Sequence, residues 1–182
     1  MVRRGVGSRA RSEGDYTPPV RRVSLLAALL CLALSTAVSA DPGRLVGAPA
    51  PAIRARAIDT DRIVALQDYR GRVVIVAFVA TWCAACRRMA PHLDELWAQH
   101  RDRGLSVVAM THEPRNRIRA HVARQGPAIP WLQCTGATAL RYGADGLPTL
   151  VLIDRQGSVR AAYRGATHEV VTRLGRAIEA LL

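Results

Sequence analysis

The residues with the clearest chemistry are two cysteines, Cys83 and Cys86, in the run Trp82-Cys-Ala-Ala-Cys86. They follow a continuous apolar stretch, 73–79, that predicts a buried strand, and they open a stretch with helical periodicity. The start of a helix favours a thiolate because the helix dipole and the free N–H groups of its first turn stabilise negative charge. Cysteines three residues apart lie one helical turn apart, within the Cα spacing that a disulfide needs. The pattern predicts a pair that exchanges between dithiol and disulfide, with Cys83 attacking and Cys86 resolving the mixed disulfide.

A metal site and an inert structural bridge are the other uses of such a pair. Tetrahedral zinc takes four ligands, usually from two spaced pairs, and no second C-x-x-C or H-x-x-x-H follows in the sequence. Cys134 and His112 would complete a site only if the fold happened to bring them to the pair. A bridge that closes so small a ring stabilises a fold little, so exchange is the better interpretation. We expect neither a metal nor another cofactor.

The elements that must position the pair follow from the spacing of apolar residues. Residues 41–51, rich in proline and glycine, are expected to be a linker. The order of the remaining elements predicts one α/β domain, a sandwich with helices on both faces of a single sheet. The expected strands cover 53–58, 63–66, 73–79, 105–110, 149–153 and 158–163, and the expected helices cover 83–103, 116–125 and 169–182.

The composition narrows the possible function classes. All 26 basic residues are arginine, so Schiff-base and other lysine chemistry is excluded. The net charge is +12, of which +8 falls on residues 41–182. These arginines are dispersed and aromatic residues make up only 4% of the chain, whereas a nucleic-acid surface clusters basic residues among aromatic ones. We predict a solvated basic surface that steers acidic protein partners, and no binding of nucleic acid.

Residues 1–40 have the pattern of an export signal. Arg21-Arg22 precede an apolar stretch, 23–38, and small residues stand three and one positions before a cut after Ala40. The apolar stretch has 16 residues, fewer than the roughly 20 of a membrane-spanning helix. We therefore expect a cleaved signal followed by one domain, 41–182, in the periplasm or another extracytoplasmic compartment. An uncleaved anchor that holds the domain on the periplasmic side of the membrane is the alternative.

A second motif lies far from the cysteines in the sequence. Gly146-Leu-Pro-Thr149 places Pro148 at the start of an expected core strand, a position in a sheet that tolerates proline. With this motif, nearly all of the chain after residue 40 resembles the thioredoxin superfamily, in particular exported redoxins (AhpC/TSA-like domains) typified by TlpA and ResA. The runs that carry the resemblance are Val46–Pro51, Leu66–Gly71, Phe78–Cys86, Pro91, Gly146–Pro148 and Ile153–Gly157.

The resemblance implies a fold, a site and partners. The implied fold is a thioredoxin-like three-layer α/β/α sandwich with an added N-terminal β-hairpin. In such proteins the peptide equivalent to Leu147–Pro148 is cis and faces the cysteines, and its backbone pairs with a bound substrate strand. Trp82, Leu147 and Pro148 are therefore expected to bind substrate. The implied partners are disulfide-bonded proteins and a membrane thiol reductant of the DsbD/CcdA type, and the protein is expected to be a monomer.

The sequence departs from these families where they place a proton acceptor for the second cysteine. Thioredoxins keep a buried acid in the strand before the motif, and that position is Ala77. Proteins like ResA have a glutamate three residues after the second cysteine, and that position is Met89. Glu113, just after the strand expected at 105–110, is the candidate substitute because strand carboxyl ends lie at the active-site edge. The alternative is that Glu113 is only a loop residue and that a water takes the proton. Cys134 is left as an extra thiol, either buried and inert or a third redox centre.

The favoured function is an exported thiol–disulfide oxidoreductase that reduces disulfides of exported proteins, for example in cytochrome c maturation. A thiol oxidase or isomerase would share every motif and differ in its reduction potential. A peroxidase is disfavoured because Ala80 stands where peroxiredoxins need a threonine. A copper-handling module of the Sco type is disfavoured because its cysteines are separated by three residues rather than two.

Overall fold

The computed structural model describes residues 41–182. Residues 1–40 lie outside this range. The predicted export signal with its cut after Ala40, and the alternative membrane anchor, are therefore not described. None of the helices within 41–182 is both long enough and apolar enough to cross a membrane.

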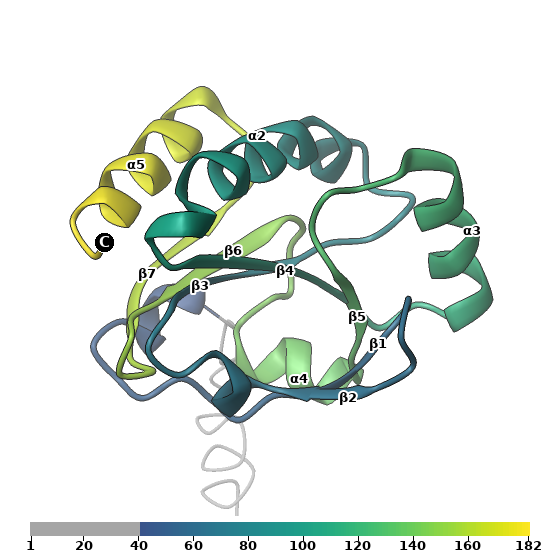
Figure 1. Ribbon diagram of the computed structural model, residues 1–182, viewed down its shortest axis with the longest axis horizontal. Coiled ribbons are helices and arrows are strands. Elements are labelled where there is room, and N and C mark those ends of the chain that lie inside the picture. Colours follow the sequence, from purple (N-terminus) through teal and green to yellow (C-terminus); the bar gives the residue numbers. More distant parts are fainter. Residues whose placement is uncertain (1–40) are drawn as a thin grey trace, which may run out of the picture. The chain divides into compact units, whose positions relative to one another are not determined.

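A seven-stranded mixed sheet runs through the domain in the order β2-β1-β5-β4-β3-β6-β7 (Figure 1). Strands β3, β4 and β5 are parallel to one another, and the remaining pairs are antiparallel. The strands are β1 (Arg54–Ala57), β2 (Ile63–Ala65), β3 (Val73–Phe78), β4 (Leu105–Thr111), β5 (Trp131–Gln133), β6 (Thr149–Ile153) and β7 (Val159–Arg164). β3, β4 and β6 are buried throughout, as their continuous apolar sequences predict.

Helices cover both faces of this sheet, as Figure 1 shows. The helices are α2 (Ala84–His100), α3 (Arg115–Gln125), α4 (Gly136–Arg141) and α5 (His168–Glu179), with short 3-10 turns at Pro42–Leu45, Leu66–Tyr69 and Arg101–Arg103. The domain has two hydrophobic cores, one on each face of the sheet, and alternate side chains of β3 pack into one or the other. Ile75 packs into the core that holds Met89 of α2 and Leu174 of α5, whereas Phe78 packs into the core that holds Ala139 of α4. The predicted thioredoxin-like sandwich is confirmed.

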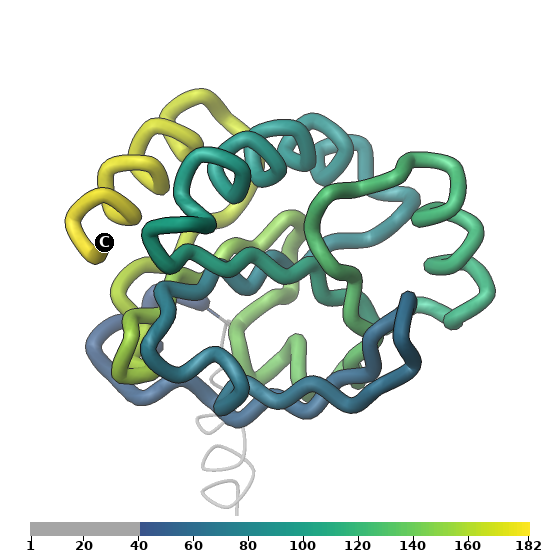
Figure 2. Tube along the Cα trace, viewed as in Figure 1, coloured from purple at the N-terminus to yellow at the C-terminus, as the bar shows by residue number. Residues whose placement is uncertain are grey.

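The N-terminal hairpin is also confirmed, because β1 and β2 pair antiparallel with Arg54 opposite Ala65. The prediction that residues 41–51 are a linker is wrong. Val159 accepts a hydrogen bond from the Gly47 N–H and donates one to the Ala48 carbonyl, so this segment lies along β7 (Figure 2). The glycines and prolines that suggested a linker permit this tight edge pairing. Two short elements, β5 and α4, were not expected from the sequence.

Candidate functional site

Cys83 is the N-cap residue of α2, and its Sγ accepts a hydrogen bond of 3.0 Å from the Cys86 N–H. The two cysteines form a disulfide with a Cα–Cα distance of 5.2 Å. Both are buried, with exposed fractions of 6% and 5%. An N–H donor and the positive end of a 17-residue helix both stabilise a thiolate at Cys83 when the bond is reduced. The pair therefore has the geometry and the electrostatics for reversible exchange.

The loop between β3 and α2 holds the cysteines at the end of the central strands. Val79 N donates to the Met110 carbonyl at 2.9 Å, and Cys83 N donates to the Ala80 carbonyl at 3.1 Å, which turns the chain into the helix. Trp82, directly before the buried Cys83, is 65% exposed. A large aromatic side chain is thus presented to solvent directly beside Cys83 in the chain.

A hollow of about 320 Å³ adjoins Cys83, and we call it the Cys83 hollow. Its lining brings Trp82 and Leu147, two predicted substrate-binding residues that lie 65 positions apart in the sequence, to Cys83. The Leu147–Pro148 peptide is cis, as predicted. Pro148 itself is buried, and its carbonyl accepts a hydrogen bond of 2.8 Å from the Gly165 N–H.

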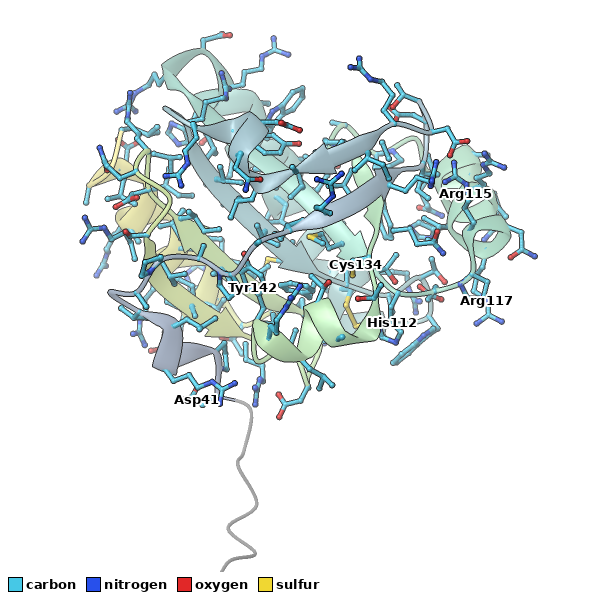
Figure 3. The ribbon with its side chains drawn as sticks, turned by 90° about the horizontal axis from the view of Figure 1, so that it is seen from below. Asp41, His112, Arg115, Arg117, Cys134 and Tyr142 are labelled. Carbon is cyan, nitrogen blue, oxygen red and sulfur yellow. A yellow bond between two sulfur atoms is a disulfide. The ribbon has the colours of Figure 1, made fainter. Side chains whose placement is uncertain are left out.

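Cys134 and His112 also line the Cys83 hollow, and both are labelled in Figure 3. Cys134 is a free, buried thiol, and burial raises its pKa to about 11. It is therefore protonated at neutral pH, although it lines the same hollow as the attacking cysteine. Among residues 41–182, no three His, Cys, Asp or Glu side chains are grouped as a metal ion would need.

A second depression of about 240 Å³ adjoins Cys86 and lies between α2 and α3; we call it the Cys86 cleft. Neither Ala77 nor Met89, both fully buried, supplies an acid to this region. The cleft is instead lined by Asp94 from α2 and by His121 from α3. Sequence reasoning missed both residues. The available signal was spacing, since Asp94 follows Cys86 by eight residues, two turns along the same helix face.

Glu113 is buried where β4 ends, and its carboxylate faces the loop that carries the cysteines. Oε2 accepts the Thr81 N–H at 2.7 Å, Oε1 accepts the Thr81 hydroxyl at 2.8 Å, and the Thr111 hydroxyl lies 3.3 Å from Oε2. The exposed Arg117 guanidinium lies 3.8 Å from Oε1. Glu113 does not line the Cys86 cleft. These contacts tie the Glu113 carboxylate to the Thr81-Trp82-Cys83 loop.

The family model that matches this sequence is the AhpC/TSA family, over residues 46–162, which include the disulfide and the cis peptide. This chain belongs to the AhpC/TSA family. Within it, the thiol–disulfide oxidoreductase ResA of Geobacillus thermodenitrificans is 33% identical over 102 residues, which are 55% of this chain and 59% of the relative. The thiol:disulfide interchange protein DsbE of Pseudomonas fluorescens is 28% identical over 144 residues, 72% of this chain and 74% of the relative.

Solved structures agree with this assignment. A crystal structure from Chlorobium tepidum, described as a thiol:disulfide interchange protein DsbE, matches with a TM-score of 0.69 and 28% identity. The match covers 73% of this AhpC/TSA-family chain and 94% of that one. Against the first ResA relatives, by contrast, the matched region spans 59 to 64% of their length.

Proposed function

We propose that this protein is an exported thiol–disulfide oxidoreductase that reduces disulfides of exported proteins, for example during cytochrome c maturation. The observation that carries the proposal is Cys83 at the start of α2, bonded to Cys86 and accepting the Cys86 N–H. The hollow that brings exposed Trp82 and Leu147 to Cys83 supports a protein strand as the substrate. The names of the ResA and DsbE relatives support the same reaction class.

The reaction runs in two exchange steps. The Cys83 thiolate attacks one sulfur of the substrate disulfide, that S–S bond breaks, and the released substrate thiolate takes up a proton. Cys86 then loses its proton and attacks the Cys83 sulfur, which breaks the mixed disulfide and releases the second substrate sulfur. The substrate gains two electrons and two protons, and Cys83 and Cys86 become the disulfide. A membrane thiol reductant of the DsbD/CcdA type returns the pair to the dithiol state.

The site and its surroundings suggest how a substrate is held. Trp82 and Leu147 flank the attacking sulfur, and the backbone next to Pro148 pairs with an extended substrate segment. The surface of residues 41–182, with its net charge of +8, attracts acidic proteins and does not serve nucleic acid. The domain acts as a monomer and needs no cofactor other than its cysteines.

Trapping the mixed disulfide tests this function. Cys86→Ala leaves Cys83 able to attack but unable to be released, so exported proteins accumulate in disulfide linkage to Cys83. The matched control is the Cys83→Ala/Cys86→Ala double variant, which captures nothing. If the single variant traps no more than the double variant, the proposed function is wrong.

The direction of electron flow is tested by the reduction potential of the Cys83–Cys86 couple. We expect a value nearer the roughly −270 mV of thioredoxin than the roughly −120 mV of DsbA, because a reductant must stabilise its disulfide form. A potential close to that of DsbA would make the protein an oxidase.

Export is tested separately. We propose that residues 1–40 are a signal removed after Ala40, and N-terminal sequencing of the protein recovered from the periplasm should begin at Asp41. Recovery in the membrane fraction with residues 1–40 intact would establish the anchored form instead.

A further inference from the structure

The second exchange step needs a group that takes the proton of Cys86, and this chain lacks an acid at both positions where its relatives carry one. Ala77 is 0% exposed in β3 and Met89 is 0% exposed in α2, so apolar atoms fill both sites. We propose that Asp94 accepts the Cys86 proton through water held in the Cys86 cleft. This inference rests on the proposed function, because it concerns the resolving step of that exchange.

The position of Asp94 follows from the geometry of α2. Cys86, Ala90 and Asp94 are spaced by four residues and all line the cleft, so one stripe of the helix forms a wall of it. Eight residues correspond to about 12 Å along a helix. That distance excludes direct contact between Cys86 and Asp94, and a few water molecules in line would cover it.

Two polar atoms in the cleft lining are suited to hold that water. Asp94 Oδ1 and Trp131 Nε1 are buried, and neither has a hydrogen-bond partner within residues 41–182. Asp94 Oδ1 can accept a hydrogen bond from water, and Trp131 Nε1 can donate one. A volume of about 240 Å³ has room for several waters, each of which takes roughly 30 Å³ in the liquid. Apolar walls such as Ile129 confine them.

The electrostatic surroundings suit a proton acceptor. Burial raises the pKa of Asp94, and the nearby backbone N–H groups of Ile129 and Ala128 offset only part of this effect. The carboxylate thus holds a proton more readily than an exposed aspartate does. Arg87 from α2 and His121 from α3 are the other titratable side chains of the cleft. Burial lowers the pKa of His121, with Arg124 and Arg87 adding to the effect and Glu113 opposing it, so the imidazole is neutral at pH 7.

The proton and electron balance of the step is simple. The Cys86 S–H bond breaks, its proton passes through water to Asp94, and the Cys86 sulfur attacks Cys83. The Cys83–substrate bond breaks, and the substrate thiolate leaves with the electron pair and is protonated from solvent. Asp94 returns its proton to solvent through the cleft before the next turnover.

The test follows the reaction of the reduced protein with an aryl disulfide whose released thiolate is coloured. The first phase reports attack by Cys83, and the second reports release of the remaining aryl thiolate by Cys86. In Asp94→Asn we expect the first phase to be unchanged and the second to be slowed about tenfold at neutral pH. In the wild type the second phase also slows as the pH falls and Asp94 takes up its proton. In the variant the second phase should instead fall steadily with pH, because its rate follows the thiolate fraction of Cys86. The acid limb, meaning the inflection set by Asp94, should be absent.

Glu95→Gln is the matched control, because it removes the same charge from the next residue of α2. Glu95 is exposed, and its Oε1 accepts a hydrogen bond of 3.1 Å from Gln99. Both phases should stay within twofold of the wild type. A thermal unfolding curve for each variant shows whether it is folded, and equal slowing of both phases in Asp94→Asn would overturn the proposal.

His121→Gln and Glu113→Gln identify the acceptor if it is not Asp94. Selective loss of the second phase and its acid limb in either variant, with Asp94→Asn unaffected, overturns the proposal. Failure of the proposed function looks different. The function is contradicted, and the role of Asp94 is unaffected, if the wild type gives both phases with the aryl disulfide but reduces no protein disulfide and Cys86→Ala traps none.

Discussion

Two hollows adjoin the disulfide, one at each cysteine, and they differ in the side chains that they offer. The Cys83 hollow has an exposed tryptophan and Leu147 in its lining, together with Phe78 and Met110. Each lining also includes a carboxylate and an imidazole, from Asp145 and His112 in the Cys83 hollow and from Asp94 and His121 in the Cys86 cleft. Within residues 41–182, only the Cys86 cleft has buried side-chain polar atoms without a hydrogen-bond partner in its lining, Asp94 Oδ1 and Trp131 Nε1. The first suits a protein surface, and the second suits water and a proton.

This division matches the unequal tasks of the two cysteines. In the proposed reaction, Cys83 must meet a large partner and needs a stable thiolate, which the start of α2 favours. Cys86 attacks only within the mixed disulfide and has to lose a proton first. Asp94 lies two turns along α2 from Cys86 and still farther from Cys83, so its charge opposes the Cys83 thiolate little.

The largest effects should come from the cysteines themselves. Cys83→Ser should abolish reduction of every disulfide, because Cys83 is the cysteine whose thiolate the start of α2 stabilises. Cys86→Ser should keep the first phase of the aryl disulfide reaction and lose the second. Stopped-flow absorbance measures both phases. A first phase that survived in Cys83→Ser would mean that Cys86 or Cys134 attacks, which would break the division between the two hollows.

Replacing Glu113 should affect the reactions of both cysteines, because Glu113 binds the loop that lies between the two hollows. Glu113→Ala leaves the Thr81 N–H without its acceptor, and we expect a loss of about 2 kcal/mol in the free energy of unfolding. Both phases should slow together as Trp82 and Cys83 lose their position. Urea unfolding and the two-phase assay measure these effects.

The control for this prediction is Glu169→Ala on α5. Its carboxylate is exposed and pairs with Arg173 at 3.6 Å, so its removal should change stability by less than about 0.5 kcal/mol. Slowing of the second phase alone in Glu113→Ala would instead support the role that the sequence suggested, a proton acceptor for Cys86.

Trp82→Ala should affect only the Cys83 hollow, and only with large substrates. We expect about a fivefold rise in KM for a protein disulfide, equivalent to about 1 kcal/mol of lost contact, because aromatic anchors dominate such interfaces. The rate with the aryl disulfide should stay within twofold. Leu140→Ala is the control, since Leu140 is 60% exposed on α4 but does not line the hollow. Equal effects of the two variants would mean that Trp82 has no special role in binding.

Much of the fold was predictable because apolar periodicity is strong where elements are long and buried. The strand predicted at 149–153 coincides with β6, and the predicted helix at 116–125 differs from α3 by one residue. By contrast, β5 has three residues and α4 has six, too few to show a period. β5 is a strand only because β4 and β1 pair with it from distant parts of the sequence.

The site was predictable to a similar degree. The cysteines and the Leu147–Pro148 motif stand out by residue type, and the structure brings Leu147 and Trp82 to one hollow. Asp94 does not stand out, because an aspartate on an amphipathic helix is normally a solvent-facing residue. Its spacing of eight residues from Cys86 places it on the same side of α2, but it lines a cleft only because α3 and the segment before β5 pack beside it.

Replacing Cys134 should have the smallest effect on the reaction. It tests whether the Cys83 hollow contains one reactive cysteine or two. The pKa of Cys134, about 11, leaves roughly one thiolate in a thousand at pH 8, so this thiol should react slowly although it lines the same hollow as Cys83. We expect iodoacetamide to leave Cys134 unmodified in the folded, oxidised protein and to modify it after unfolding, as mass spectrometry would report. Cys134→Ala should keep both phases within twofold of the wild type. A lost second phase or a Cys83–Cys134 disulfide would make Cys134 a third redox centre, and the Cys83 hollow would then resolve disulfides as well as bind them.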